Sequence, residues 1–153
     1  MEPNRGFTLI ELVIALAIFG IAAALTVPAY LSWQDDSRAK GAAASMRADF
    51  ERARMRAIRE NANVRVVFST DSYLVHTDFN SDNALDADED MVTQKTLPAG
   101  VTLTNNFSGD DMSFSSRGIP AAGLSDAGTV TMSSPGGSVY SVVVSRFGRI
   151  RTE

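Results

Sequence analysis

The sequence predicts an α+β fold in which a long N-terminal helix packs on an antiparallel β-sheet or small sandwich. Three observations support this prediction. Between Phe7 and Leu31 only Glu11 is charged, apolar residues recur at helical spacing in 35–60, and the pattern after Asn61 changes to the alternation of strands. With 153 residues and a net charge of −4, the chain is long enough for one domain with a modest core.

Residues 7–31 form an apolar run that predicts a transmembrane helix. The run has 25 residues, and a helix of roughly 20 residues crosses the hydrocarbon core of a membrane. A secretory signal peptide is the alternative, but it fits poorly because an acid lies inside the run and helix-forming sequence follows it. Pro28 removes one backbone hydrogen bond, which predicts a kink near the membrane surface.

Residues 32–61 are predicted to continue as an amphipathic helix. Met46, Phe50, Ala53 and Ala57 recur at spacings of four, three and four, which makes a stripe that packs on a domain. The arginines lie mostly off this stripe and alternate with acids, which indicates a solvated or subunit-facing surface: Arg47, Arg52, Arg54, Arg56 and Arg59, with Asp49, Glu51 and Glu60.

Residues 62–153 are predicted to form the β-rich globular domain. Short alternating runs are separated by Gly and Pro. The predicted strands cover 64–68, 73–76, 91–97, 101–105, 112–116, 128–133 and 138–146. Strands this short and numerous indicate an antiparallel sheet or small sandwich, with the amphipathic helix covering one face.

The composition argues against several kinds of catalysis. The chain has no cysteine and one histidine, which excludes disulfides, thiolate metal sites and multi-histidine metal centres. His76 lies in a predicted strand with no carboxylate at a recognisable spacing, so a structural role is expected and no nucleophile–base pair emerges. The chain is therefore predicted to be a non-enzyme that requires no cofactor.

An acidic loop has the spacing of a twelve-residue calcium site. Segment 78–89 contains five acids and no base. Oxygen ligands fall at loop positions 1, 3, 5, 9 and 12 with a backbone carbonyl at position 7, provided by Asp78, Asn80, Asp82, Asp86, Glu89 and Ala84. Asn83 stands where glycine is usual, and a solvated acidic loop without metal is the alternative.

The run Gly6-Phe7-Thr8-Leu9-Ile10-Glu11 resembles the cleavage and methylation motif of type IV prepilins. The resemblance implies that Met1–Gly6 is a leader, that a prepilin peptidase cuts after Gly6, and that the amine of Phe7 is methylated. Glu11 and Pro28 would be the fifth and twenty-second residues after the cut, as the family pattern requires.

The cost of a charged side chain inside a membrane supports a role for Glu11 in assembly. A carboxylate inside a membrane is costly and is functional by default. Its natural partner in a filament of packed helices is the positive amine of a neighbouring Phe7, and such a pair fixes register because an unpaired charge costs several kcal/mol. An ordinary membrane anchor with a stray acid is the alternative.

The C-terminal Gly148-Arg149-Ile150-Arg151, the small domain and the acidic loop look like the GspH/FimT class of minor pilins and pseudopilins. Some FimT-like members bind DNA through arginines of this tail, which makes Arg149 and Arg151 candidates with Arg146 as a helper. Gly148 would let phosphates approach closely. The alternative is a final edge strand whose arginines keep the sheet edge soluble.

The resemblance implies a single-pass inner-membrane protein with a periplasmic β domain, assembled into a type IV pilus or a type II secretion pseudopilus. The expected partners are other pilins, the prepilin peptidase and the inner-membrane assembly platform. DNA binding is the alternative function, and a membrane-anchored calcium module that never polymerises is a third. The sequence does not distinguish pilus from pseudopilus, or tip from shaft.

The calcium site makes a prediction that melting tests. A ligand at about 100 times its dissociation constant adds about 2.7 kcal/mol to the stability of the folded state, so millimolar calcium should raise the melting temperature above its value in chelator. An unchanged melting curve would refute the site.

Overall fold

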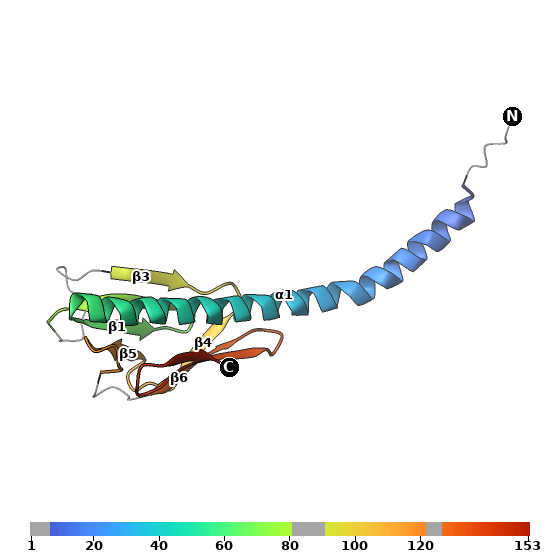
Figure 1. The fold of residues 1–153 in the computed structure, drawn as a ribbon. Coiled ribbons are helices and arrows are strands. Elements are labelled where there is room, and N and C mark those ends of the chain that lie inside the picture. The colour runs from blue at the N-terminus through green and yellow to red at the C-terminus, as the bar shows by residue number, and fades with distance from the viewer. Residues whose placement is uncertain (1–6, 81–90, 122–126) are drawn as a thin grey trace. The chain divides into compact units, whose positions relative to one another are not determined.

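The computed structural model describes residues 7–80, 91–121 and 127–153, and Figure 1 shows its ribbon. One helix, α1 (Leu9–Glu60), is followed by strands, which confirms the predicted fold class. The chain divides into two compact units, Met1–Gln34 and Asp35–Glu153. The division falls within α1, so a single helix contributes to both units.

The described part of Met1–Gln34 is a helix whose side chains have almost no cover. All its large apolar side chains are exposed, with exposed fractions between 49% at Val13 and 86% at Phe7. The helix is long and apolar enough to cross a membrane by length and composition. Thr26 donates its hydroxyl to the carbonyl of Ala22 at 2.8 Å, which satisfies this hydroxyl inside the helix.

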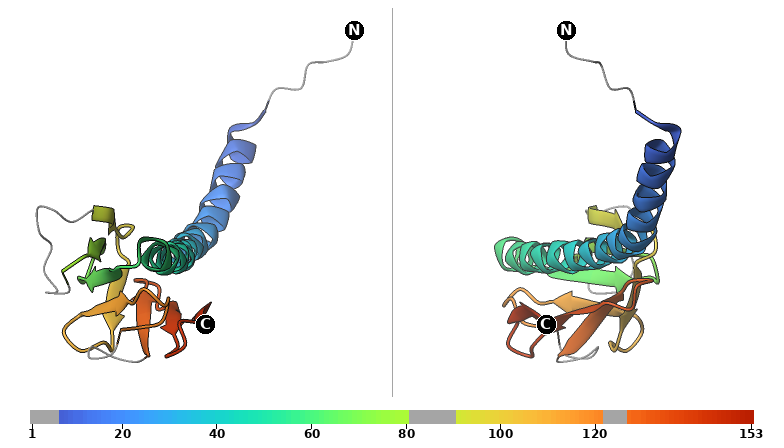
Figure 2. Two further views of the ribbon diagram at one scale, coloured as in Figure 1. Left: turned by 60° about the vertical axis from the view of Figure 1, so that its left-hand side comes forward. Right: turned by 90° about the vertical axis from the view of Figure 1, so that its right-hand side faces the viewer.

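In Asp35–Glu153 the helix buries one face against the strands. Met46, Phe50, Ala53 and Ala57 are all fully buried, which confirms the stripe predicted from their spacing. The alanines bring the backbone of α1 close to the sheets. Figure 2 shows the strands of the two sheets against different sides of this half of the helix.

The helix ends at a residue in the left-handed conformation. Asn61 has φ 52°, a value that asparagine tolerates better than most residues with a Cβ. The amide of Ala62 then donates to the carbonyl of Ala57 at 3.3 Å, as in a Schellman cap. This turn directs the chain into the first strand.

The described strands form two antiparallel sheets of four. The first has the order β3-β2-β1-β5 and the second β4-β6-β7-β8. Their bounds are β1 (Asn63–Phe68), β2 (Ser72–Asp78), β3 (Met91–Thr96), β4 (Thr102–Asn105), β5 (Asp111–Phe114), β6 (Gly128–Ser133), β7 (Val139–Val144) and β8 (Ile150–Thr152).

Aromatic side chains connect the helix to the first sheet. Phe50 of α1 lies 6.1 Å from Phe68 of β1 and 6.3 Å from Phe114 of β5, measured between ring centroids. Phe68 stacks in turn on Phe107 at 5.7 Å. The buried residues of the second sheet belong to the same apolar cluster, so both sheets share one core with the helix.

The main difference from the sequence prediction lies at the C-terminus. The predicted strand 138–146 ends at Val144, and a turn leads into β8. β8 pairs with β7 at the edge of the second sheet, with Arg151 opposite Val143. The final edge strand is therefore the arrangement observed for this part of the tail.

Two similar turns meet at the end of β5 and of β7. In each, a serine carbonyl accepts a hydrogen bond from a glycine amide, Ser115 from Gly118 at 2.7 Å and Ser145 from Gly148 at 2.8 Å. Both glycines have positive φ, 70° and 74°. A Cβ at Gly148 would overlap the carbonyl oxygen of Gly118, and that oxygen already accepts a bond from Arg54 Nε at 2.9 Å.

The contact between the turns predicts a large effect of Gly148→Ala. The substitution adds backbone strain of about 1–2 kcal/mol and a clash with backbone, so the free energy of unfolding should fall by more than 2 kcal/mol. Gly137→Ala is the matched control, because Gly137 has φ 85° but no atom within 4 Å of a Cβ. Urea unfolding in detergent measures both, and equal losses would contradict the packing role.

Candidate functional site

The N-terminus of α1 is closed by reciprocal hydrogen bonds between Thr8 and Glu11. The Glu11 carboxylate accepts from the Thr8 amide at 3.0 Å and from the Thr8 hydroxyl at 2.9 Å. The Glu11 amide donates back to the Thr8 hydroxyl at 3.3 Å. This is a capping box, which the sequence analysis did not identify although Thr-x-x-Glu is its signature.

The other predicted N-terminal residues are placed as follows. Gly6 lies outside the described residues, and Phe7 precedes the helix with an exposed side chain. Pro28 lies inside α1, which continues as helix on both sides of it. The cleavage point and the kink at Pro28 therefore stay predictions.

A cluster of polar side chains, centred on Asp49, lies between α1 and the first sheet. The side chain of Asp49 is buried, with an exposed fraction of 1%, and its carboxylate accepts from the Tyr73 hydroxyl at 2.5 Å. Arg52 forms an ion pair with the same carboxylate, and Lys95 Nζ lies 3.5 Å from it. Lys95 also donates to Ser45.

The buried position of Asp49 contradicts the prediction that it lies on a solvated or subunit-facing surface. Asp49 lies three residues after Met46 and four before Ala53, so it belongs to the buried stripe by spacing. The charge of Asp49 favoured an exposed position in the prediction, because Asp is seldom buried unless it is paired. The spacing was the signal that would have identified it.

The surroundings of Tyr73 change the pKa of its hydroxyl. Burial, together with the hydrogen bond to the Asp49 carboxylate, raises the pKa of the Tyr73 hydroxyl above its ordinary value. The neutral phenol is held between α1 and the first sheet, where ionisation would place a second negative charge beside Asp49. The contacts of Asp49 with Tyr73 and Lys95 connect α1 to β2 and β3.

The candidate calcium loop is only partly within the described residues. Asp78 ends β2 with a buried side chain, and Asn80 is exposed. Asp82, Ala84, Asp86 and Glu89 lie outside the described residues. Within residues 7–80, 91–121 and 127–153 no group of three or more acids or histidines is arranged to hold a metal, so calcium binding stays a prediction.

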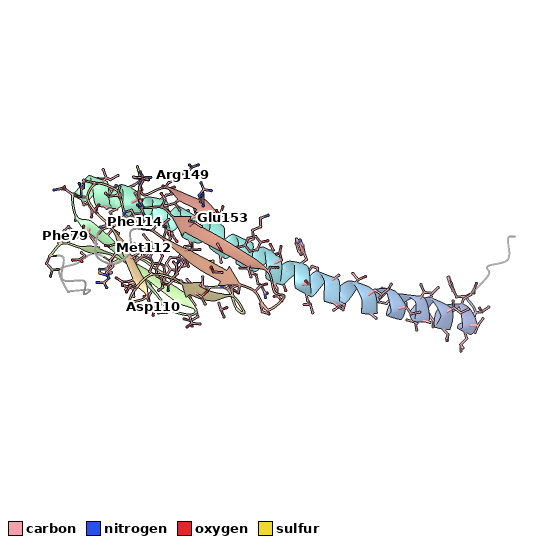
Figure 3. The ribbon with its side chains drawn as sticks, turned by 90° about the horizontal axis from the view of Figure 1, so that it is seen from below. Phe79, Asp110, Met112, Phe114, Arg149 and Glu153 are labelled. Atoms are coloured by element: carbon pink, nitrogen blue, oxygen red, sulfur yellow. The ribbon has the colours of Figure 1, made fainter. Side chains whose placement is uncertain are left out.

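The three tail arginines occupy the second turn and the edge strand. Arg146 and Arg149 are exposed at the turn, and Arg151 lies in β8. Arg151 pairs with Glu153 at 2.8 Å, which neutralises part of the positive charge. Figure 3 labels Arg149 and Glu153 at the two ends of this strand.

The structure gives Gly148 a role different from the one predicted. Its missing Cβ makes room for the Gly118 carbonyl of the neighbouring turn. Since Gly148 is buried, it is required by the fold, and approach of a phosphate is not needed to explain it.

His76 is buried in β2. Its neighbours across the sheet are Arg65 of β1 and Met91 of β3.

Comparisons with known proteins agree on one family. Residues 42–148 match the model of the family described as type II transport protein GspH. Residues 1–27 match the prokaryotic N-terminal methylation motif. The first match covers well over half of the chain and includes most of the β domain.

Individual proteins and structures agree with the family match. The pilin-like protein PilA1 of Thermus thermophilus is 32% identical over 98% of this chain and 99% of its own. The minor pseudopilin EpsH of the type 2 secretion system of Vibrio cholerae has a TM-score of 0.59 at 18% identity, covering 76% of this chain and 96% of its own.

The type IV minor pilin FimU of Pseudomonas aeruginosa has a TM-score of 0.62 at 14% identity, covering 79% of this chain and 92% of its own. At these identities the two structures establish the fold.

The buried phenol predicts how stability depends on pH. Because the folded-state pKa of Tyr73 is raised, its contribution is complete below the unfolded value of about 10 and is lost as pH rises above it. The free energy of unfolding should fall by up to about 1.4 kcal/mol per pH unit from this group alone. Urea unfolding between about pH 9 and 11.5 measures the slope.

Tyr73→Phe should have a lower stability at neutral pH but a shallower decline in alkali. Tyr140→Phe is the comparison. The Tyr140 hydroxyl also donates to a carboxylate, that of Asp36 at 2.8 Å, which raises its pKa, but Tyr140 is outside the buried Asp49 cluster, so Tyr140→Phe should change the alkaline slope less than Tyr73→Phe. An alkaline slope unchanged by Tyr73→Phe would contradict the assignment.

Proposed function

Because the chain belongs to the GspH family of type II transport proteins, we propose that it works as a filament subunit whose apolar helix is covered by other subunits after assembly. Members of this family are minor pilins and pseudopilins, and the chain is one of them. The observation that carries the proposal is the exposed apolar surface of this helix, because a large apolar surface is unfavourable in water and marks an interaction with a membrane or with other proteins.

Maturation is the first proposed step. A prepilin peptidase cuts after Gly6 and methylates the new amine of Phe7. The match of residues 1–27 to the methylation motif supports this step. Phe7 then becomes the start of the chain, one residue before the Thr8 that caps α1.

The proposed location is the inner membrane, with a single span and a periplasmic β domain. Residues 7–31 carry one charge and expose apolar side chains all round, as a lipid-facing helix does. The β domain has its own core in Asp35–Glu153. An assembly platform in the membrane would extract the helix and insert it into the filament.

Glu11 has two proposed roles, one within a single chain and one between subunits. In a single chain its carboxylate completes the capping box with Thr8. In the filament the same carboxylate, which retains acceptor positions, pairs with the positive amine of a neighbouring Phe7 and sets the register between subunits.

Pilus and pseudopilus remain two uses of this one subunit. PilA1 and FimU are named as pilin proteins and EpsH as a pseudopilin of a secretion system. DNA binding through Arg146, Arg149 and Arg151 is the alternative function.

Substitutions at Gly6 and Glu11 test the proposal. Gly6→Ala should leave the precursor uncut, seen as an unchanged intact mass, and should prevent assembly. Glu11→Ala should be cut but not assembled, because it removes both the cap and the charge.

Glu11→Gln separates the two roles of Glu11, since glutamine completes a capping box without charge. Failure of Glu11→Gln to assemble is expected if the charge pairs between subunits, and normal assembly would show that only the cap matters. Glu51→Ala, an acid on the same helix in the other unit, is the control. Normal processing and assembly in both Gly6→Ala and Glu11→Ala would refute the filament function.

A further inference from the structure

A mainly apolar groove runs between α1 and the edge strand β3. Its volume is about 290 Å³, and its walls include Ser37, Gly41 and Ser45 of the helix and Lys95 and Leu97 of the opposite side. All of these residues lie in Asp35–Glu153. We call this feature the α1–β3 groove.

Among the residues that the structure describes, no contact requires glycine at position 41 of this groove. A Cβ built at Gly41 would meet no atom within 4 Å, so neither close packing nor positive φ requires glycine. Glycine in a helix interior costs about 1 kcal/mol relative to alanine. The space beside Gly41 is open among the described residues, so a side chain from a partner can occupy it.

The walls of the groove are held in place by the Asp49 cluster. The Tyr73 ring lines the groove while its hydroxyl is bonded to Asp49 at 2.5 Å. Lys95 is fixed between Ser45 and Asp49. Because the polar atoms of these side chains are occupied by one another, what the groove presents to a partner is mainly apolar and preorganised.

The charges at the groove identify the kind of partner that fits. Arg38 and Lys95 line it, and both are partly exposed. Both are already paired within the chain, Arg38 with Asp35 and Lys95 with Asp49, so the groove offers a partner no unpaired charge. The apolar segment 7–31 carries no basic residue and one acid, so a second subunit's segment of this kind meets no repulsion.

We propose that the α1–β3 groove receives an apolar side chain from the α1 helix of a neighbouring subunit in the filament. The volume suits one or two large side chains, and the exposed large apolar residues of this chain are concentrated in 7–33. This inference rests on the proposed filament function and adds a contact between the β domain of one subunit and the helix of another.

Filling the groove tests the proposal. Gly41→Leu places a side chain in open space, so the melting temperature should not fall, but assembled filament should decrease at least about tenfold because overpacking of an interface costs about 1–3 kcal/mol. Gly41→Ala should melt no lower than the natural chain and still assemble.

Ala48→Leu is the matched control, since Ala48 is exposed on the same helix and does not line the groove. Filament yield of Gly41→Leu equal to that of Ala48→Leu would overturn the proposal. If Glu11→Ala filaments are lost while Gly41→Leu assembles normally, the groove contact is wrong and the filament function stands.

Cross-linking gives a second measurement that does not depend on how Gly41→Leu folds. The chain has no cysteine, so Gly41→Cys can be paired with single cysteines at positions 25, 27, 31 and 33. Disulfides between subunits of assembled filaments are expected for at least one pair and not for Ala48→Cys. No cross-link from Gly41→Cys at any of these positions would overturn the proposal.

Discussion

The apolar first half of α1 is the constraint on which the rest of the structure depends. Residues 7–33 expose large apolar side chains on every side, and such a helix is stable only in a membrane or among other apolar helices. The second half of the same helix already has its cover, because Met46, Phe50, Ala53 and Ala57 are buried under two sheets. One helix thus joins a domain that folds on itself to a segment that needs neighbours.

The β domain holds the second half of α1 in place through a shared core and a polar cluster. Its sheets share one core with α1 through Phe50 and the alanines of the helix. The Asp49 cluster then holds α1 to β2 and β3 by directed bonds. Removing either partner of a buried pair leaves an unpaired polar group that costs about 1–3 kcal/mol, so this cluster resists sliding of the helix over the first sheet.

Much of the fold was predictable from the sequence, because it depends on local periodicity. The helical stripe and the seven predicted strands are each found in the structure near their expected bounds. The turn at 145–148 was not predicted, and the strand predicted over 138–146 ends at Val144, because Val142 to Ile150 contains only one glycine and no proline. That glycine was explained by ligand binding, whereas its neighbour in space is Gly118, 30 residues earlier in the sequence.

The candidate site was predictable to a smaller extent. The motif at Gly6–Glu11 is contiguous, so the sequence identified it directly, and its match to the methylation motif agrees. Asp49 was misplaced because its partner Tyr73 is 24 residues away. The α1–β3 groove could not be seen at all, since it is a space between residues 37–45 and 95–98 that only the fold brings together.

The proposed filament function requires that residues 7–33 be covered by lipid in the membrane and by other subunits in the filament. Single cysteines in this cysteine-free chain test it with a water-soluble maleimide that does not cross membranes. Leu16→Cys should be protected in both states, whereas Val139→Cys, at the exposed start of β7, should be labelled in the membrane-bound subunit. Equal labelling of the two cysteines in both states would contradict the account.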